Sequence, residues 1–427
     1  MIKNPSKLPL NRNSRTILRI LNEGLESSIP SAYLKKYILK NKIQLSLSQI
    51  DLKKYNHVFL IAIGKSAGTM TEYVSKKIDF KNGIVVVPNG VTPKLNKSVF
   101  EIINAGHPLP NQNSFTAGRK LVSFLDGIAK NDFVVFLISG GGSALSVYPD
   151  SISLSDKILV NKKLIRSGAN VNEIACIRKH LSLIKGGRLI QNMNSSGISF
   201  LVSDVIGDDI GSISSGITTY DKSTFDDALK IIKKFSLEHK FPKSALSILK
   251  SGSYGKILET PKKSKIKNII ILNNSACLSK MKDKSRQLGY KTSVIPNIVG
   301  HLDQVTKMIT SVAVNSKSNC IVFGGEPTVN VTGSGKGGRN QELVLRLYEK
   351  LKHSKHHFTI ASIGTDGIDG NTKFAGSIFS TEYDYDGKPY LKNNDSSSFF
   401  KKFGGLIKTG ITQNNVNDIG VVVRHTL

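Results

Sequence analysis

Cysteine is scarce in this chain, and so are long apolar runs. Only three cysteines occur among 427 residues, at Cys176, Cys277 and Cys320, with no Cys-x-x-Cys pair. That excludes a disulfide framework and a structural zinc site, and it favours a reducing cytoplasm. The longest apolar runs are far shorter than the ~20 residues that cross a bilayer, and the N-terminus lacks the apolar core of a signal peptide. We therefore expect a soluble, cytoplasmic protein with no membrane partner.

Acidic residues are also few. The chain has 31 Asp and Glu against 60 Lys and Arg, which gives a formal charge of +29. Such an excess is compatible with a nucleic-acid partner, or with a field that gathers small anions. The lysines, however, are scattered along the chain and are not interleaved with aromatic residues that stack bases. A lysine-rich solvated surface is the simpler interpretation, and no nucleic-acid partner is expected.

What the chain does have is a series of short apolar runs. They are continuous rather than alternating, as strands covered on both faces should be, and they are HVFLIAIG, GIVVVPNG, DFVVFLISGGG, ISFLVSDVIGDD, NIIILNNS, NCIVFGGE, HFTIASIGTDG and DIGVVV. Stretches with helical spacing lie between them, for example Leu343, Leu347 and Leu351. We predict an α/β fold of two domains, each with a mostly parallel sheet flanked by helices, the first of them Rossmann-like.

The segment KSGSYGKILETPKKSKIKN is rich in Gly, Ser, Pro and Lys and separates two series of strands. It predicts an N-terminal domain over residues 1–250, a linker over 251–268 and a C-terminal domain over 269–427, with the extreme C-terminus free to pack back on the first. Most strands run directly into Gly, Ser or Asp. In open parallel sheets, ligands bind at that carboxyl end of the strands.

Two loops at strand ends are candidate phosphate sites. FVVFLI is followed by a loop whose backbone N–H groups can converge on an anion, formed by Ser139, Gly140, Gly141, Gly142 and Ser143. LIAI is followed by Gly64, which turns the chain, and by Lys65 and Ser66 at the start of a predicted helix. There the lysine ammonium adds to the positive end of the helix dipole. The simpler alternatives are a flexible turn and a solvated lysine.

Two acidic loops follow other strands. LVSDVIGDD places Asp204 at a strand end, with Asp208 and Asp209 one tight turn later, and such a group suits Mg²⁺ together with substrate phosphates. IGTDGIDG carries Asp366 and Asp369 with a spacing that does not fit an EF-hand, so metal binding and orientation of a hydroxyl both stay open. Asp and Gly are also common turn residues.

The stretch VTGSGKGGRNQELVL contains a dinucleotide fingerprint and a near match to a P-loop. The preceding TVNV alternates like an edge strand and no acid follows after about 20 residues, which disfavours the dinucleotide. The P-loop interpretation fails because Asn340 stands where Ser or Thr would hold magnesium. What remains is the guanidinium of Arg339 at a helix start, suited to a carboxylate or phosphoryl group, with Gly338, Asn340 and Gln341 as candidate cofactor contacts.

NEIACIRKHLSLIKGGRLI predicts a helix that ends at Gly186 and Gly187. It carries the basic residues Arg178, Lys179, Lys185 and Arg188. Basic residues near a helix C-terminus usually serve the dipole or solvent, which is the role assigned to them first. Lys185 is also included among the candidate cofactor-binding residues.

Taken in order, these stretches resemble the glycerate 2-kinases of the MOFRL family, also called class II glycerate kinases. The matching stretches extend from about residue 58 to the C-terminus, and they are GKSAGTM, NAGHPLPNQNS, LISGGGSALS, IRKHLSLIKGGRL, SDVIGDD, GGEPTVNVTGSGKGGRNQELVL, GTDGIDG and NNDSSSFFKKFGGLIKTGITQNNVND. The chain departs from the family at Asn111, where Asp is common, and at Ile217, where Pro is common.

The resemblance implies two α/β domains, ATP with a divalent metal such as Mg²⁺, and transfer of the γ-phosphoryl group to the 2-hydroxyl of D-glycerate. It also implies active-site roles for Lys65 and Arg339. Phosphoryl transfer depends mainly on positioning and positive charge, which these residues supply. We expect the Ser139–Ser143 loop and Lys65 to bind phosphates, and Arg339 to bind the glycerate carboxylate or the migrating phosphoryl group.

Two carboxylate roles complete this hypothesis. Asp204 with Asp208 or Asp209 is expected to hold magnesium, and Asp366 or Asp204 to accept the hydroxyl proton. Two rival functions stay open: an NAD(P)-dependent hydroxypyruvate reductase, and a non-enzymatic protein that binds RNA or small anions. The sequence leaves the phosphorylated position and the oligomeric state open, with a homodimer as one expectation.

Overall fold

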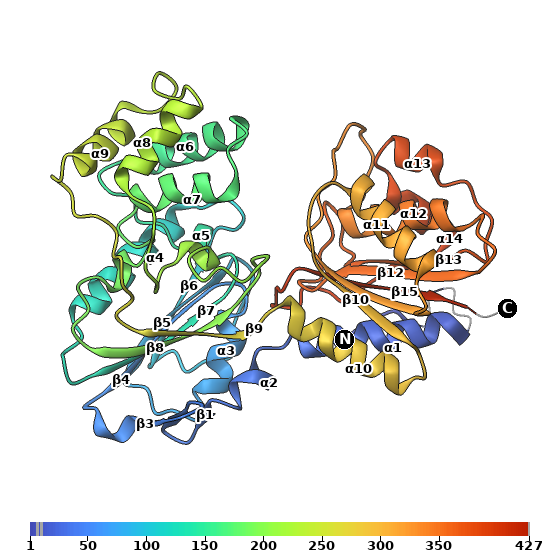
Figure 1. Cartoon of the computed structure of the whole chain (residues 1–427). Helices are drawn as coiled ribbons and strands as arrows, with labels where there is room; N and C mark the ends of the chain where they lie inside the picture. The colour runs from blue at the N-terminus through green and yellow to red at the C-terminus, as the bar shows by residue number, and fades with distance from the viewer. Residues whose placement is uncertain (6–7, 9–11, 426–427) are drawn as a thin grey trace. The chain divides into compact units, whose positions relative to one another are not determined.

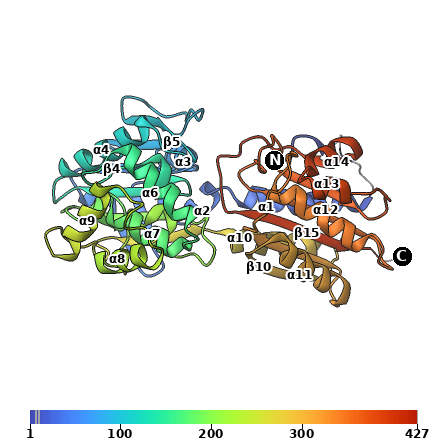
Figure 2. The same cartoon turned by 90° about the horizontal axis from the view of Figure 1, so that it is seen from above.

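The computed structural model describes residues 1–5, 8 and 12–425, and it divides into two compact units (Figures 1 and 2). Unit 1 comprises Met1–Ile29, Asp204–Gly207 and Leu272–Leu427, and unit 2 comprises Pro30–Ser203 and Asp208–Ile271. Within the described ranges, no helix is both long and apolar enough to cross a bilayer.

Unit 2 is built on a six-stranded sheet in the order β6-β5-β4-β7-β8-β9. Its strands are β4 (Val58–Ile63), β5 (Asn82–Pro88), β6 (Phe100–Ala105), β7 (Phe133–Ile138), β8 (Ser196–Val202) and β9 (Lys267–Leu272). The pairings among β4 to β8 are all parallel. The chain runs outward from β4 to β6 and then returns to the other side of β4, so its direction reverses between β4 and β7. This is the Rossmann strand order, which confirms the Rossmann-like prediction.

The helices of unit 2 fall into two groups (Figure 1). The first group consists of α2 (Ser31–Leu34), which contacts α3, and of three helices that follow strands of the sheet, α3 (Ala67–Val74), α4 (Gln112–Asp126) and the short α5 (Gly142–Leu145). The second shares an apolar core of its own and consists of α6 (Leu154–Arg166), α7 (Val171–His180), α8 (Phe225–Lys234) and α9 (Lys243–Ser253). The unit also contains a small antiparallel sheet, formed by β1 (Ile38–Leu39), β2 (Lys42–Gln44) and β3 (Gln49–Asp51). It has three short 3-10 turns as well, η2 (Leu52–Lys54), η3 (Arg188–Ile190) and η4 (Ile213–Ser215).

Helix α7 is shorter than predicted. It ends at His180, and Ser182 pairs with Pro149 in an isolated bridge that takes the chain away from the helix axis. Gly186 and Gly187, expected to terminate the helix, adopt positive φ angles of 60° and 84° in a separate turn. Their N–H groups donate to the carbonyls of Ser215 and Gly216. This turn therefore braces the loop that contains η4.

Unit 1 has a second six-stranded sheet, in the order β10-β11-β15-β12-β13-β14. Its strands are β10 (Thr292–Ile298), β11 (Cys320–Gly325), β12 (Phe358–Gly364), β13 (Gly376–Ser380), β14 (Leu406–Ile407) and β15 (Asp418–Arg424). Only β10 and β11 pair in parallel, and the other four pairings are antiparallel. The prediction of a mostly parallel sheet is wrong for this unit, because the C-terminal strand inserts antiparallel between β11 and β12.

Helices on both faces explain why these antiparallel strands are apolar throughout. Helices α1 (Arg12–Ser27) and α10 (Asn274–Gln287) cover one face, and α11 (Leu302–Asn315) and α12 (Arg339–Leu351) cover the other (Figure 1). Two further helices, α13 (Lys388–Lys392) and α14 (Ser396–Phe403), pack against α12. A strand that is buried on both sides gives a continuous apolar run whichever its direction, so the run alone does not distinguish parallel from antiparallel pairing.

The compact units differ from the predicted division in two respects. Residues 1–29 belong with the C-terminal strands in unit 1, where α1 packs on α10 and β15, rather than with the N-terminal domain. The expected linker 251–268 begins inside α9 and leads into β9, the sixth strand of unit 2, so the chain leaves that unit only after Ile271. The C-terminal strand β15 lies within the sheet of unit 1 itself.

Candidate active site

The glycine-rich loop of unit 2 forms a cluster of backbone donors at the point where the strand order reverses. It follows β7, next to the loop that follows β4, and ligands of such sheets bind at this position. The four consecutive N–H groups from Gly140 to Ser143 donate to no group in the described part of the chain. Amides grouped in this way bind anions. We refer to Gly140–Ser143 as the amide nest.

The loop after β4 holds the amide nest in place. The Lys65 N–H donates to the Gly140 carbonyl at 2.9 Å, and the Ser66 N–H donates to Ser139 Oγ at 3.0 Å. A Cβ added at Gly64, whose φ is +131°, would lie 2.2 Å from Ser139 Oγ, so only glycine allows the two loops to approach so closely. Ser66 and Ser139 are buried, and the Ser66 backbone and the Ser139 hydroxyl make one of these loop contacts, so a role of the two serines as phosphate ligands stays a prediction.

The η4 turn packs against the other side of the amide nest. Ser214 Oγ donates to the Ser139 carbonyl at 2.7 Å, and the hydroxyls of Ser143 and Ser215 are 2.6 Å apart. Ser214, Ser215 and Gly216 all have positive φ angles, of 49°, 61° and 67°. Left-handed backbone is unfavourable for serine, and strain of this kind tends to occur where side chains must be placed for function. Here the two hydroxyls fix the position of the nest.

Lys185 contacts the loop of the nest from the protein interior, and its side chain does not reach solvent. Its side chain is fully buried, and Nζ donates to the Ser143 carbonyl at 2.9 Å. Burial, together with the nearby Lys157 and Arg178, lowers the pKa of Lys185 well below its usual value. The structure therefore places this predicted cofactor-binding residue against the loop.

Arg339 in unit 1 lies at the start of α12, as predicted, but two carboxylates already bind it. Nε and Nη2 donate to Asp418 at 2.5 Å and 3.1 Å, and Nη1 donates to Glu326 at 2.8 Å. These carboxylates raise the pKa of Arg339, so it stays charged. Burial raises the pKa of Asp418 to about 6, although the guanidinium opposes this shift. The Nε edge of the guanidinium therefore cannot clamp a ligand, which leaves the second N–H of each terminal nitrogen for that role.

Asp418 was missed in the sequence because of strand direction, whereas Glu326 was not singled out although it follows a strand. Glu326 follows β11 and Asp366 follows β12, whereas Asp418 begins the antiparallel β15, so all three lie at the same edge of the sheet. A Cβ on Gly364 would lie 3.2 Å from Asp366 Oδ1 and 3.5 Å from Asp418 Oδ1. The signal for Asp418 in the sequence is that it is an acid directly before the final apolar run. We call Glu326, Arg339, Asp366 and Asp418 the Arg339 cluster.

The start of α12 does bind an anion, and that anion is a side chain of the protein. The Asp369 carboxylate accepts from the backbone N–H groups and the side-chain amides of Asn340 and Gln341, at 2.9–3.2 Å. A Cβ on Gly338 would lie 2.3 Å from the Asp369 carboxyl carbon. The donors of Asn340 and Gln341 are therefore occupied within the protein, and a cofactor contact at Gly338, Asn340 and Gln341 stays a prediction. The TVNV segment before them forms no strand, only a single bridge from Thr328 to His301.

Replacing Asp369 with alanine should destabilise unit 1 strongly. The change leaves two backbone donors and the Asn340 side-chain amide unpaired in a buried site and removes one of the two acceptors of the Gln341 amide, so we expect the free energy of unfolding to fall by about 2–4 kcal/mol. Denaturant titration would measure this effect. Asp384→Ala, at an exposed position of the same unit, is the matched control and should change stability by less than about 0.5 kcal/mol. A similar, small effect of both changes would contradict the role of Asp369.

The predicted magnesium ligands do not form a metal centre by themselves. Among the described residues, no group of three or more His, Cys, Asp or Glu side chains is placed to hold a metal ion. Asp204 Oδ2 accepts from Asn415 Nδ2 at 3.2 Å, and Asp209 Oδ2 accepts from Ser212 Oγ at 2.5 Å. Asp208 has a φ of +57° in the same turn. One or two carboxylates suffice for Mg²⁺ only when phosphates and water supply the other ligands.

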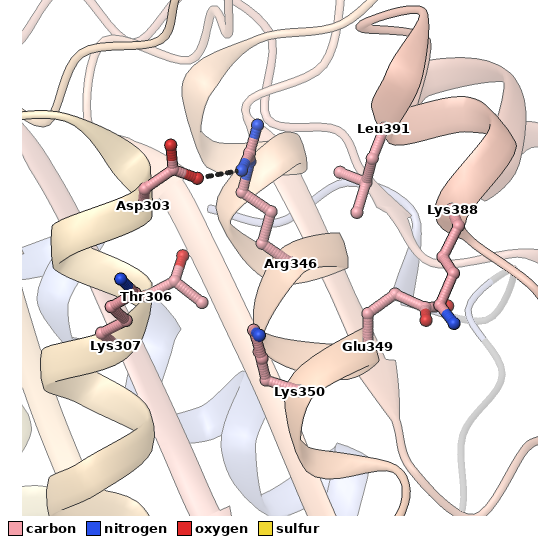
Figure 3. A pocket seen from close by; sticks show the side chains of 8 residues that line it. All are labelled: Asp303, Thr306, Lys307, Arg346, Glu349, Lys350, Lys388 and Leu391. Carbon is pink, nitrogen blue, oxygen red and sulfur yellow. Dashed lines mark hydrogen bonds and ion pairs between the residues drawn. The ribbon is translucent and has the colours of Figure 1, made fainter.

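A separate groove lies between α11, α12 and α13 (Figure 3). It has a volume of about 480 Å³ and is lined by Asp303, Thr306, Lys307, Arg346, Glu349, Lys350, Lys388 and Leu391. Arg346 binds Asp303 and Glu342, so its charge is balanced. Because Arg346 lies two turns after Arg339, about 10 Å along the helix, the groove is distinct from the Arg339 cluster.

Comparison with known proteins decides the family. Residues 319–418 match the MOFRL family, and residues 16–250 match a family described as a domain of unknown function, DUF4147. The chain is 32% identical over 426 residues to the glycerate 2-kinase of Pyrococcus horikoshii, covering 95% of this chain and 96% of that protein. This chain belongs to the MOFRL glycerate 2-kinase family. The resemblance inferred from the loops is thereby confirmed.

The fold is that of solved MOFRL glycerate kinases. The crystal structure of glycerate kinase from Thermotoga maritima matches it with a TM-score of 0.81 at 32% identity, covering 95% of this chain and 98% of that one. A relative from Agrobacterium vitis, 33% identical and with 96% of this chain and 95% of that protein covered, is named provisionally as a hydroxypyruvate reductase. The departure at Asn111 is conservative in structure, because its side chain caps α4 as Asp would.

Proposed function

We propose that this chain transfers the γ-phosphoryl group of ATP to the 2-hydroxyl of D-glycerate, giving 2-phosphoglycerate and ADP. The amide nest carries the proposal. It offers four N–H groups to an oxyanion at the position where sheets of this order bind ligands, in a chain that matches glycerate 2-kinases over nearly its whole length.

The residues of unit 2 fit the phosphates of ATP. The nest supplies amides, Ser143 a hydroxyl, and Lys65 an ammonium on a side chain whose stem passes Gly141, since a Cβ on Gly141 would lie 3.4 Å from Lys65 Cγ. The glycines leave room for phosphate oxygens to approach the backbone. Bound Mg²⁺ would neutralise phosphate charge, with Asp208 and Asp209 as its ligands from unit 2 and Asp204 as a further candidate.

The Arg339 cluster supplies the groups that act on the acceptor. As the hydroxyl oxygen of glycerate bonds to the γ-phosphorus, the bond from that phosphorus to the bridging oxygen breaks and ADP leaves. The terminal nitrogens of Arg339 stabilise the charge of the carboxylate or of the migrating phosphoryl group. Asp366 is the proposed acceptor of the hydroxyl proton, with Asp204 as the alternative.

The product decides between the candidate reactions. Incubation of the full chain with ATP, Mg²⁺ and D-glycerate should release ADP and yield 2-phosphoglycerate, identified by ³¹P NMR. Formation of 3-phosphoglycerate would overturn the assigned position. Oxidation of NADH with hydroxypyruvate, without release of ADP from ATP and D-glycerate, would favour a reductase instead.

A further inference from the structure

Three basic side chains meet behind the amide nest. Lys157 comes from α6, Arg178 from α7, and Lys185 from the segment that follows α7 (Figure 1). Lys157 is 6% exposed and Lys185 is fully buried, while Arg178 is half-buried with its Nε covered from solvent. We call these three residues the cation trio. Lys185 Nζ donates to the Ser143 carbonyl, and α7, which carries Arg178, contacts the η4 turn that packs on the nest, so the trio lies close to the nest.

The trio has no acidic partner in the described part of the chain. The side chains of Lys157 and Arg178 make no hydrogen bond or ion pair there, and Arg178 Nε is covered and without an acceptor. Other basic residues of the same segment are paired: Lys179 binds Asp221 at 3.1 Å, and Arg188 donates to the Leu258 carbonyl at 2.8 Å. Arg188 Nε is also covered and without an acceptor, but Asp150, Glu259 and Asp221 lie near enough to oppose the lowering of the Arg188 pKa, whereas no acid does so for the trio.

Burying three cations together without an anion is unfavourable, because each loses hydration and repels the others. The pKa values of Lys157 and Arg178 reflect this unfavourable burial. Burial and the charge of Arg178 lower the pKa of Lys157 to about 7, and burial lowers the pKa of Arg178. Hydrophobic residues or an acid at these positions would remove the cost. An oxyanion bound at the nest would offset it as well.

We propose that Arg178, supported by Lys157 and Lys185, binds a phosphate group of the nucleotide beside the amide nest. The assignment rests on the proposed function for the identity of the ligand. Phosphate is favoured over a carboxylate because a di- or trianion matches three cations, and because the guanidinium offers planar, paired donors. Arg178 is the member that contacts the phosphate, while Lys185 positions the Ser143 carbonyl and Lys157 adds charge.

Direct binding tests the subsite without turnover. The full chain and its Arg178→Gln variant would be titrated by calorimetry with ADP and Mg²⁺, with inorganic phosphate, and with D-glycerate. We expect ADP to bind about 10- to 100-fold more weakly to the variant, as for a lost charge-assisted hydrogen bond, and D-glycerate to bind unchanged. Arg166→Gln, at an exposed position on α6, is the matched control and should leave ADP binding within twofold.

A second readout separates ligand binding from a structural role. Removing one cation from an unpaired trio relieves repulsion, so Arg178→Gln and Lys157→Met should each raise the Tm of the nucleotide-free chain while weakening ADP binding. Unchanged ADP affinity in both variants would overturn the subsite, and so would a loss confined to D-glycerate. If the chain binds ADP through Arg178 but phosphorylates no glycerate, the proposed function fails and the subsite stands.

Discussion

Replacing Arg339 with lysine is expected to lower kcat/KM for D-glycerate by roughly 10²- to 10³-fold, the range seen when one donor to developing charge is lost. Lysine keeps the charge but lacks the planar fork, so it cannot bind Asp418 through two parallel hydrogen bonds and still offer terminal donors to a ligand. The coupled ADP-release assay would measure the loss across a range of glycerate concentrations.

Arg346 provides the matched control on the same helix. It also binds two carboxylates, Glu342 and Asp303, but it lines the separate groove of Figure 3. Arg346→Lys should therefore lower the free energy of unfolding only slightly, as Arg339→Lys should, and leave kcat/KM within about threefold of the parent chain. Wild-type turnover in Arg339→Lys, or an equal loss in both variants, would contradict the role given to Arg339.

The second large effect is expected at Gly64. Its Cβ would lie 2.2 Å from Ser139 Oγ and 2.5 Å from the Ser139 carbonyl oxygen, at a φ of +131°. Gly64→Ala should cost about 1–2 kcal/mol in backbone strain and a further ~1–3 kcal/mol in crowding. Because the displaced atoms hold the amide nest, we also expect ATP to bind at least tenfold more weakly, as calorimetry would show.

Gly90 separates strain from crowding. It also has a positive φ, of +81°, but nothing lies within 4 Å of an added Cβ. Gly90→Ala should therefore cost only the strain, about 1–2 kcal/mol, and leave ATP affinity unchanged. If both alanine variants lost the same stability and kept ATP affinity, the approach of the two loops would not be what shapes the nest.

The sequence predicted that two loops of unit 2 lie side by side, because the signal there is local. A buried run such as FVVFLI ends in three glycines, and the parallel order brings its exit next to that of β4. For this reason the sequence alone predicts that the loops containing Lys65 and Gly141 lie next to each other. Which of the hydroxyls point inward could not be predicted, and Ser66 and Ser139 proved to be buried loop contacts.

The part of the candidate site in unit 1 depends on contacts between residues that are far apart in the sequence. The helix start at Arg339 is visible in the sequence, but its anion, Asp369, comes from a loop about 30 residues later, and Asp418 from a strand about 80 residues later. A glycine-rich helix start is equally suited to a phosphate and to a carboxylate of the protein. No local sequence pattern indicates that β15 runs antiparallel. The sequence therefore does not predict that Asp418, at the start of β15, lies at the edge where β11 and β12 end.

The division of the chain between the units has a consequence for biosynthesis. Helix α1 is synthesised before the rest of unit 1, yet its buried face, which includes Ile17, Ile20 and Leu21, packs on α10 and β15. Unit 2 is complete once Ile271 has left the ribosome, whereas the apolar face of α1 is not fully buried until first α10 and then β15 have been synthesised. A fragment that starts at Leu272 would expose the opposite surface of that interface, so aggregation is the expected fate of unit 1 when it is expressed without its first 29 residues.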